Sequence, residues 1–244
     1  MVQKSFLSVA ALLFILAPTM RADTIIAQTN ATAGTNLAVG GVSGSSVDTF
    51  TGAITWTQSS TYDNVAITAD LSFVLGTGAT QYTLTAFLMS AIGPGTTTAQ
   101  QLASSTLTDS NTGFTTRTLF SGLTLGPGTY YLVLWGPNDC SSPGGGPGGT
   151  GCQTTPSEAR WAATSSPSIT TAPGVTGGNE LVANGPSPVY PPAQTFVSSG
   201  GFVVFSVTGD PAGGGSGVPE PSSLSMLGLG VLGLLGFARR RSQA

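Results

Sequence analysis

Apolar and polar residues alternate along much of the middle of the chain, and this alternation predicts β-strands. Between residues 65 and 75 every second residue is apolar, at Val65, Ile67, Ala69, Leu71, Phe73 and Leu75. A period of two gives a strand one apolar face and one solvated face, so this segment predicts a half-buried antiparallel strand. Shorter runs of the same kind predict further strands at residues 53–57, 81–89, 101–104, 116–120 and 202–207.

Residues 130–135 form an apolar run with no polar face, which predicts a strand at the centre of a sheet. Glycine and proline turns such as Ile92-Gly93-Pro94-Gly95 separate the runs, and no amphipathic helix or internal repeat occurs among them. We therefore predict an all-β fold, an antiparallel β-sandwich or jelly roll. In segments 23–48 and 156–194, which are rich in Gly, Ser, Thr and Pro, we expect mainly loops with at most one or two short strands.

A separate apolar segment lies near the first residue. Lys4 is followed by the apolar residues 6–17, and a short polar stretch then ends at Ala22. This order of basic, apolar and small residues predicts a secretory signal peptide over residues 1–22. We therefore expect the rest of the chain to be exported.

A second apolar segment, residues 224–238, is followed by Arg239, Arg240 and Arg241. Its fifteen residues (238 − 224 + 1) would extend roughly 22 Å as a helix, which is short for a bilayer core of about 30 Å. Ser222, Ser223 and snorkelling arginine side chains extend the reach, so we predict a marginal transmembrane segment over residues 222–238. The positive-inside rule keeps the three arginines cytoplasmic.

The motif Pro219-Glu220-Pro221 stands just before this segment. Motif, apolar span and arginine stop together resemble the sorting tail of the PEP-CTERM family of Gram-negative bacteria. The resemblance implies that Pro219, Glu220 and Pro221 are the sorting motif and Arg239 to Arg241 the membrane stop. It also implies that the tail holds the chain in the inner membrane until an exosortase acts near the motif, after which the protein reaches the cell surface or the exterior.

These features divide the chain into four parts. They are a signal peptide at residues 1–22, a β-sandwich domain at 23–208, a Gly-rich linker at 209–217 and the sorting tail at 218–244. Residues 125–134 also resemble the turn-and-strand segments of the lectin-like sandwiches carried ahead of such tails.

The charge balance of residues 23–217 excludes nucleic acid as a partner. This part has nine acidic residues and two basic ones, Arg117 and Arg160, so its net charge is near −7 (2 − 9). It has no lysine, and a chain of this kind lacks the basic surface that binds phosphate backbones.

The absence of histidine from the sequence narrows the catalytic options. It excludes Ser-His-Asp and Cys-His catalysis and histidine-bound zinc, and no Gly-x-Ser-x-Gly nucleophile motif occurs. A pair of carboxylates is the remaining route to hydrolysis, and no spacing singles out a pair. We therefore expect a protein that is not an enzyme and has no cofactor.

Cys140 and Cys152 flank a stretch of Gly, Ser and Pro. Two cysteines in an exported chain, joined by a loop that can close, predict a disulfide. Free thiols or a metal site are the alternatives.

Aromatic residues are the candidate ligand-binding side chains. Trp161 and Tyr190 stand in loop-like sequence, where we expect them to be exposed and able to stack on sugar rings. Trp56 and Trp135 stand in strand patterns and are expected in the core. Asp63 with Asn64 or Asp70 could hold calcium through oxygen ligands, although Asp63-Asn64 is more typical of a turn.

The sequence thus predicts an exported component of the cell envelope or extracellular matrix, with a structural or adhesive role and exopolysaccharide as its partner. A carbohydrate-binding module is the alternative from another class. Ice binding is a remote third possibility, because similar tails occur on some ice-binding proteins and the chain is rich in threonine, but it lacks the repeats that flat threonine arrays need.

Overall fold

The computed structural model describes residues 23–30, 34–40, 49–76, 78–136, 157–165, 167–185 and 190–212. They fall within one compact unit, Asp23–Ala212. The predicted signal peptide and sorting tail lie outside the described residues. Within the described part no helix has the length and apolar character needed to cross a membrane.

Eight strands form the first sheet, in the order β10-β1-β14-β4-β9-β13, with β2 paired to β9 and β7 to β4. All their pairings are antiparallel. The strands are β1 (Thr24–Asn30), β2 (Thr35–Val39), β4 (Tyr62–Val74), β7 (Thr115–Leu125), β9 (Glu158–Thr164), β10 (Ser168–Thr171), β13 (Phe202–Val203) and β14 (Phe205–Pro211).

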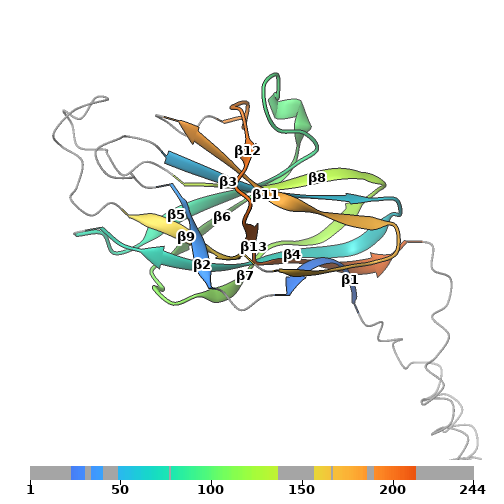
Figure 1. Cartoon of the computed structure of the whole chain (residues 1–244), viewed down its shortest axis with the longest axis horizontal. Helices are drawn as coiled ribbons and strands as arrows, with labels where there is room; N and C mark the ends of the chain where they lie inside the picture. The colour runs from blue at the N-terminus through green and yellow to red at the C-terminus, as the bar shows by residue number, and fades with distance from the viewer. Residues whose placement is uncertain are drawn as a thin grey trace, which may run out of the picture. The chain divides into compact units, whose positions relative to one another are not determined.

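Six strands form the second sheet, in the order β12-β11-β3-β8-β5-β6, again antiparallel. They are β3 (Thr49–Gln58), β5 (Tyr82–Met89), β6 (Gln101–Asp109), β8 (Gly128–Trp135), β11 (Val175–Gly185) and β12 (Val197–Ser198), and a short 3-10 turn, η1 (Thr98–Gln100), precedes β6. Figure 1 shows the two sheets as two layers, with β3, β8 and β11 in one and β1, β4 and β7 in the other. The predicted all-β antiparallel sandwich is confirmed for the described part.

The core lies between the sheets and is built from the inward residues of each alternating strand. Trp56 and Trp161 are its largest members, and both are at most 1% exposed. Trp56 stacks on Tyr130 with 5.6 Å between ring centroids. The Tyr130 hydroxyl donates to the Gly126 carbonyl oxygen at 2.7 Å, and burial raises the pKa of this phenol.

Strong alternation located its strands correctly. Residues 65–74 of the predicted run lie in β4. Residues 130–135 belong to β8, which lies between β3 and β5 as predicted for a central strand. The expectation of mainly loops at 156–194 was wrong, since β9, β10 and β11 lie there, and the segment 23–48 holds β1 and β2.

The linker boundary also needs correction. β14 extends to Pro211, because its residues continue to pair with β4 as far as Pro211 opposite Tyr62. The first three residues of the predicted linker 209–217 therefore belong to the last strand of the domain.

Candidate functional site

A polar surface covers the outward face of the eight-stranded sheet, and strand alternation explains its composition. In β4, Ala69 and Leu71 face the core, so Thr68 and Asp70 face outward. Antiparallel register places Thr116 of β7 opposite Asp70, and Ser206 of β14 opposite Thr68.

The same register reaches one strand further. Gln28 of β1 lies opposite Ser206 of β14, so four neighbouring strands bring hydroxyl, amide and carboxylate groups together on one face. No segment of the chain supplies more than one or two of these groups, which is why the sequence alone did not reveal the cluster.

A pocket of about 340 Å³ lies on this face. Val204 lies at the pocket, between β13 and β14, where the hydrogen bonds of the chain change from β9 to β4. Val204 N–H donates to the Ala162 carbonyl at 2.7 Å, while the Val204 carbonyl accepts from Asp70 N–H at 3.3 Å. The pocket is lined by Gln28, Thr29, Thr68, Ala69, Asp70, Thr116, Val204, Phe205 and Ser206.

Asp70 is the one ionisable residue of the pocket lining, and a hydrogen bond holds its side chain in place. Thr116 Oγ1 donates to Asp70 Oδ1 at 2.6 Å. The lining hydroxyls and the Gln28 amide can each both donate and accept, and Asp70 adds a strong acceptor. Thr29 Oγ1 has no hydrogen-bond partner among the described residues, although it is buried. The arrangement suits a ligand that carries several hydroxyl groups.

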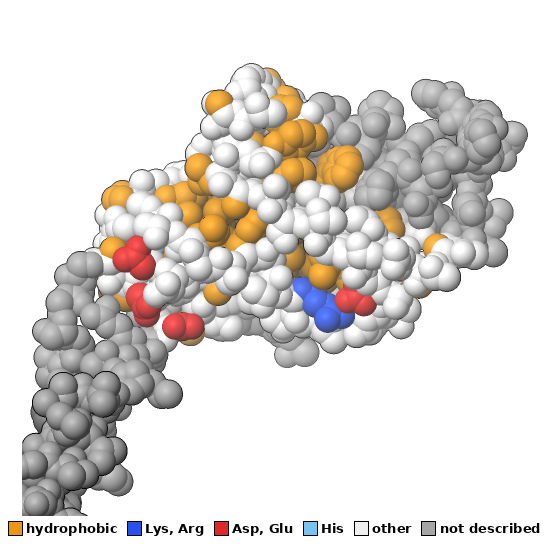
Figure 2. Space-filling model, turned by 180° about the vertical axis from the view of Figure 1, so that it is seen from behind, with side chains coloured by type: hydrophobic (Ala, Val, Ile, Leu, Met, Phe, Trp, Pro, Cys, Tyr) orange, Lys and Arg blue, Asp and Glu red, His pale blue; other side chains and the backbone are white. Residues whose placement is uncertain are grey.

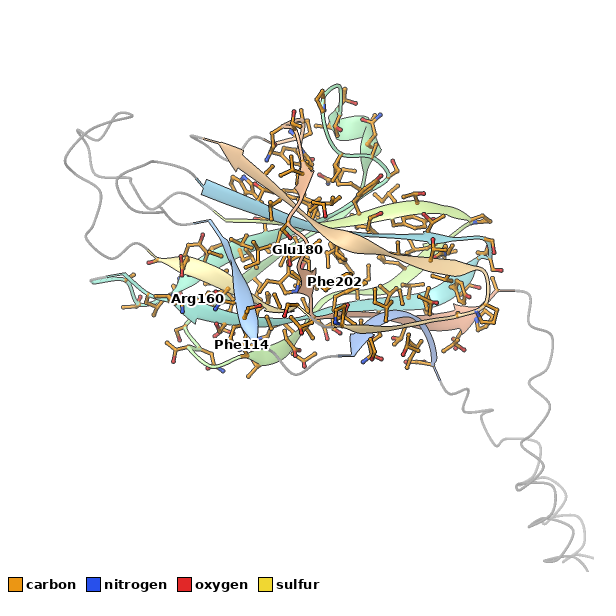
Figure 3. The ribbon with its side chains drawn as sticks, in the orientation of Figure 1. Phe114, Arg160, Glu180 and Phe202 are labelled. Carbon is orange, nitrogen blue, oxygen red and sulfur yellow. The ribbon has the colours of Figure 1, made fainter. Side chains whose placement is uncertain are left out.

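An aromatic and a basic side chain stand further along the same layer. Arg160 of β9 lies opposite Ser72 of β4, and its Nε donates to Glu158 Oε1 at 2.7 Å. Phe114 stands just before β7 and is 42% exposed. Figure 3 shows Arg160 and Phe114 at the same end of the lower layer.

The two aromatic candidates, Trp161 and Tyr190, differ in their exposure to solvent. Trp161 was expected to be exposed, and this was wrong: it is 0% exposed, faces the core from β9 and donates its Nε1 hydrogen to the Val204 carbonyl at 2.9 Å. The alternation of Ala159, Trp161 and Ala163 was the available signal, and the Pro- and Ser-rich flanks obscured it. Trp161 is therefore part of the core.

Tyr190 is exposed as predicted, with 40% of its surface accessible. Its ring stacks on Phe87 at 4.6 Å and its hydroxyl donates to Gln101 Oε1. It belongs to a segment, residues 190–196, that lies against the outward face of the six-stranded sheet and leads into the edge strand β12. Gln194 Nε2 donates there to Thr51 Oγ1 at 3.1 Å.

Apolar residues on this second outward face form a small cluster beneath that segment. Phe87, Met89 and Val133 are buried there, and Trp135 and Phe196 pack against them. Trp135 is thus partly buried on the outside of the sheet rather than in the core between the sheets, whereas the core position predicted for Trp56 is confirmed. Figure 2 shows hydrophobic side chains gathered on the upper part of the face in view, where charged side chains are absent.

The carboxylates considered for calcium have other partners. Asp63 Oδ1 accepts from Thr124 Oγ1 at 2.9 Å, and Asn64 Nδ2 donates to Asp210 Oδ2 at 2.9 Å. Asn64 lies within β4 at a register shift with a φ of 51°, so the expected turn at Asp63-Asn64 is a bulge in a strand. Asp70 lies seven residues after Asp63 in β4. In the described part, no group of three or more acidic or cysteine residues could hold a metal ion.

The remaining predicted site residues lie outside the described residues. They are the cysteines of the predicted disulfide, Cys140 and Cys152, and the tail residues Pro219, Glu220, Pro221, Arg239, Arg240 and Arg241.

Comparison with known proteins bears on the tail. No match was found among curated proteins. A family model described as the PEP-CTERM protein-sorting motif matches residues 217–242, which include the Pro-Glu-Pro triplet, the apolar segment and the three arginines. The chain therefore carries a PEP-CTERM protein-sorting motif at residues 217–242.

Proposed function

We propose that this protein is a component of the cell envelope or extracellular matrix with a non-catalytic structural or adhesive role. The observation that carries the proposal is the sorting motif at residues 217–242, which follows closely after the last strand of an all-β domain. The motif indicates export and processing at a membrane. In the proposed route, residues 222–238 hold the chain in the inner membrane while an exosortase acts near Pro219-Glu220-Pro221.

The surface of the domain supports a role among hydrated polymers. The two cations of the described part are each paired with an acid, Arg117 with Asp109 and Arg160 with Glu158. Hydroxyl pairs bridge neighbouring strands, as between Thr57 and Thr129 at 2.9 Å. Figure 2 shows that charged side chains are few on the face in view. A surface of neutral hydroxyl groups exchanges hydrogen bonds with water and with polysaccharide on similar terms, which fits exopolysaccharide as the surroundings.

The non-catalytic part of the proposal rests on chemistry. The sequence contains no histidine, and residues 23–217 contain no lysine, so the common general bases and amine nucleophiles are missing. Carboxylates remain, and most of those in the described part are held by neighbouring side chains: Asp63 and Asp70 by threonine, Asp210 by asparagine, Glu180 by serine, and Asp109 and Glu158 by arginine.

The sorting route is tested by changing Pro219, Glu220 and Pro221 to alanine in a Gram-negative host that makes an exosortase. Intact mass and membrane fractionation then compare this variant with the natural chain. We expect the natural chain to leave the inner membrane and to lose the mass of the residues beyond the cleavage point, while the variant stays whole in the membrane.

A control variant with alanine at Gly213, Gly214 and Gly215 changes three residues before the matched motif and should be processed like the natural chain. If the natural chain also keeps its full mass and stays in the inner membrane, the tail is a permanent anchor and the proposed sorting is wrong.

A further inference from the structure

We propose that the pocket on the outward face of the eight-stranded sheet binds one neutral sugar unit of a polysaccharide. This inference rests on the proposed adhesive role and assigns it a site and a ligand class. The site is defined by Gln28, Thr68, Asp70, Thr116 and Ser206, which four adjacent strands bring together around the pocket.

The functional groups of the pocket match those of a sugar. A sugar ring presents several hydroxyl groups, each of which both donates and accepts hydrogen bonds. The pocket offers hydroxyls from Thr68, Thr116 and Ser206, an amide from Gln28 and a carboxylate from Asp70. A carboxylate accepts hydrogen bonds at both oxygens, and hydrogen bonds to a charged group are stronger than neutral ones.

Charge selects a neutral sugar over an acidic one. Asp70 is the one ionisable side chain among the lining residues, and none of them is a cation. A uronate, sulfate or phosphate group would meet a carboxylate without a compensating positive charge, and like charges in a partly desolvated site repel. The same argument disfavours phosphate-bearing ligands such as nucleotides.

The size and rigidity of the pocket suit a single unit. Its volume of about 340 Å³ lies near the lower end of the roughly 300–1,000 Å³ usual for small-molecule sites. Asp70 is held from two sides, by Thr116 Oγ1 at 2.6 Å and through its own N–H by the Val204 carbonyl at 3.3 Å. Polar groups fixed on paired strands lose little freedom on binding, which favours affinity.

An exposed aromatic ring precedes the strand that supplies Thr116. Phe114 lies just before β7 and is 42% exposed. It is not among the residues that line the pocket. In the proposed complex this ring stacks on a neighbouring sugar of the bound chain, as aromatic rings commonly do against the apolar faces of sugars.

The test uses the protein as its host releases it, in affinity electrophoresis through gels that contain dextran, mannan or galactan as neutral probes and alginate as an acidic one. The domain offers a matched pair of carboxylates: Asp70 bonds Thr116 within the pocket, and Asp63 bonds Thr124 on the same two strands outside it. We expect retardation by at least one neutral polysaccharide and none by alginate. Asp70→Ala should weaken binding by roughly 10- to 100-fold, as expected for losing a hydrogen bond to a charged group, and Asp63→Ala should not.

Gln28→Ala provides a second variant on the opposite wall and should also weaken binding, while thermal unfolding checks that every variant is folded. Retardation by none of the three neutral polysaccharides, or equal loss with Asp70→Ala and Asp63→Ala, would overturn the proposal. Loss with Tyr190→Ala but not with Asp70→Ala would also overturn it, because the ligand would then lie on the other sheet. None of these variants alters residues 217–242, so a pocket that fails the test leaves the sorting result unaffected.

Discussion

Glu180 is the most buried charged side chain of the described part, with 4% of its surface exposed. It comes from β11 of the six-stranded sheet and accepts a hydrogen bond on Oε1 from Ser199 Oγ. Its other carboxylate oxygen has no partner among the described residues. Ser199 lies between β12 and β13, where the chain passes from one sheet to the other, and Figure 3 shows Glu180 and Phe202 near one another between the layers. The hydrogen bond between Ser199 and Glu180 thus holds the segment between β12 and β13 against β11.

Replacing Ser199 with alanine should therefore destabilise the domain. Glu180 would be left buried without its donor, and an unsatisfied buried acceptor costs about 1–3 kcal/mol. Urea unfolding followed by tryptophan fluorescence measures the change, and Ser198→Ala, at an exposed neighbouring residue, is the control. Equal midpoints for the two variants would show that the Ser199 hydroxyl does not support Glu180.

Asp109 provides a pH-dependent contribution to stability. Burial alone would raise the pKa of its carboxyl, but the N–H groups of Asn111 and Ser110 and the Arg117 guanidinium together lower that pKa below its usual 3.8. Folding therefore favours the ionised form, so this stabilisation is complete above pH 3.8 and is lost as the pH falls through the lower folded value.

In consequence Asp109→Asn should be less stable than the natural domain at neutral pH, and the difference should shrink once the pH falls below 3.8. Unfolding midpoints measured across this range check the expectation. A difference that stays constant at all pH values would mean that the Asp109 charge does not contribute.

At the scale of elements, the sequence was informative where a single strand carried its own pattern. The sequence alternates cleanly over residues 65–75, most of which form β4, and residues 130–135 of β8 are continuously apolar, so each strand could be located without knowledge of its neighbours. β11 could not, because Gly177-Gly178 interrupts its pattern. The register of β11 against β3 shifts between Gly177 and Glu180, and this shift turns the Glu180 side chain inward.

The pocket was unpredictable for a related reason. Nearness in sequence suggests Asp70 as a calcium ligand with Asp63, and no spacing singles it out as one of a catalytic pair. Its actual neighbours, Thr116 and Ser206, are fixed by pairing between strands far apart in the chain. Which residues lie opposite one another depends on how distant strands pair, and the sequence of a single strand does not determine this.

The bulge in β11 leads to an element-scale prediction. A Cβ atom at Gly178 would lie 2.2 Å from Thr55 Cγ2 and 2.6 Å from the Thr55 carbonyl oxygen, so the two strands would have to separate. Gly178→Ala should cost about 1–3 kcal/mol, the usual range for overpacking. Gly126→Ala, where a Cβ atom meets nothing within 4 Å, is the control in the same thermal unfolding measurement. A melting temperature for Gly178→Ala as high as that of the control would contradict the close approach of β11 and β3.

At the scale of the whole domain, its first and last strands are neighbours. β14 is the last strand of the described residues and lies between β1 and β4, inside the eight-stranded sheet. Val207 of β14 is 0% exposed and packs in the core, while its neighbour Thr208 faces outward.

Val207→Asp should therefore unfold the domain as a unit, because an unpaired buried charge costs several kcal/mol and typical stabilities are only about 5–15 kcal/mol. Thr208→Asp places the same charge in solvent and should leave the domain folded. Circular dichroism and limited proteolysis of both variants provide the measurement. Retention of the full β signal by Val207→Asp would show that β14 is dispensable.

The interior position of β14 also sets an order of events during export. In the proposed route the chain crosses the membrane amino end first, so β1 and β4 receive their shared partner only after almost the whole domain has crossed. The sorting match begins at residue 217, six residues after Pro211 (217 − 211). On the proposed route the eight-stranded sheet is therefore completed only as the sorting match reaches the membrane.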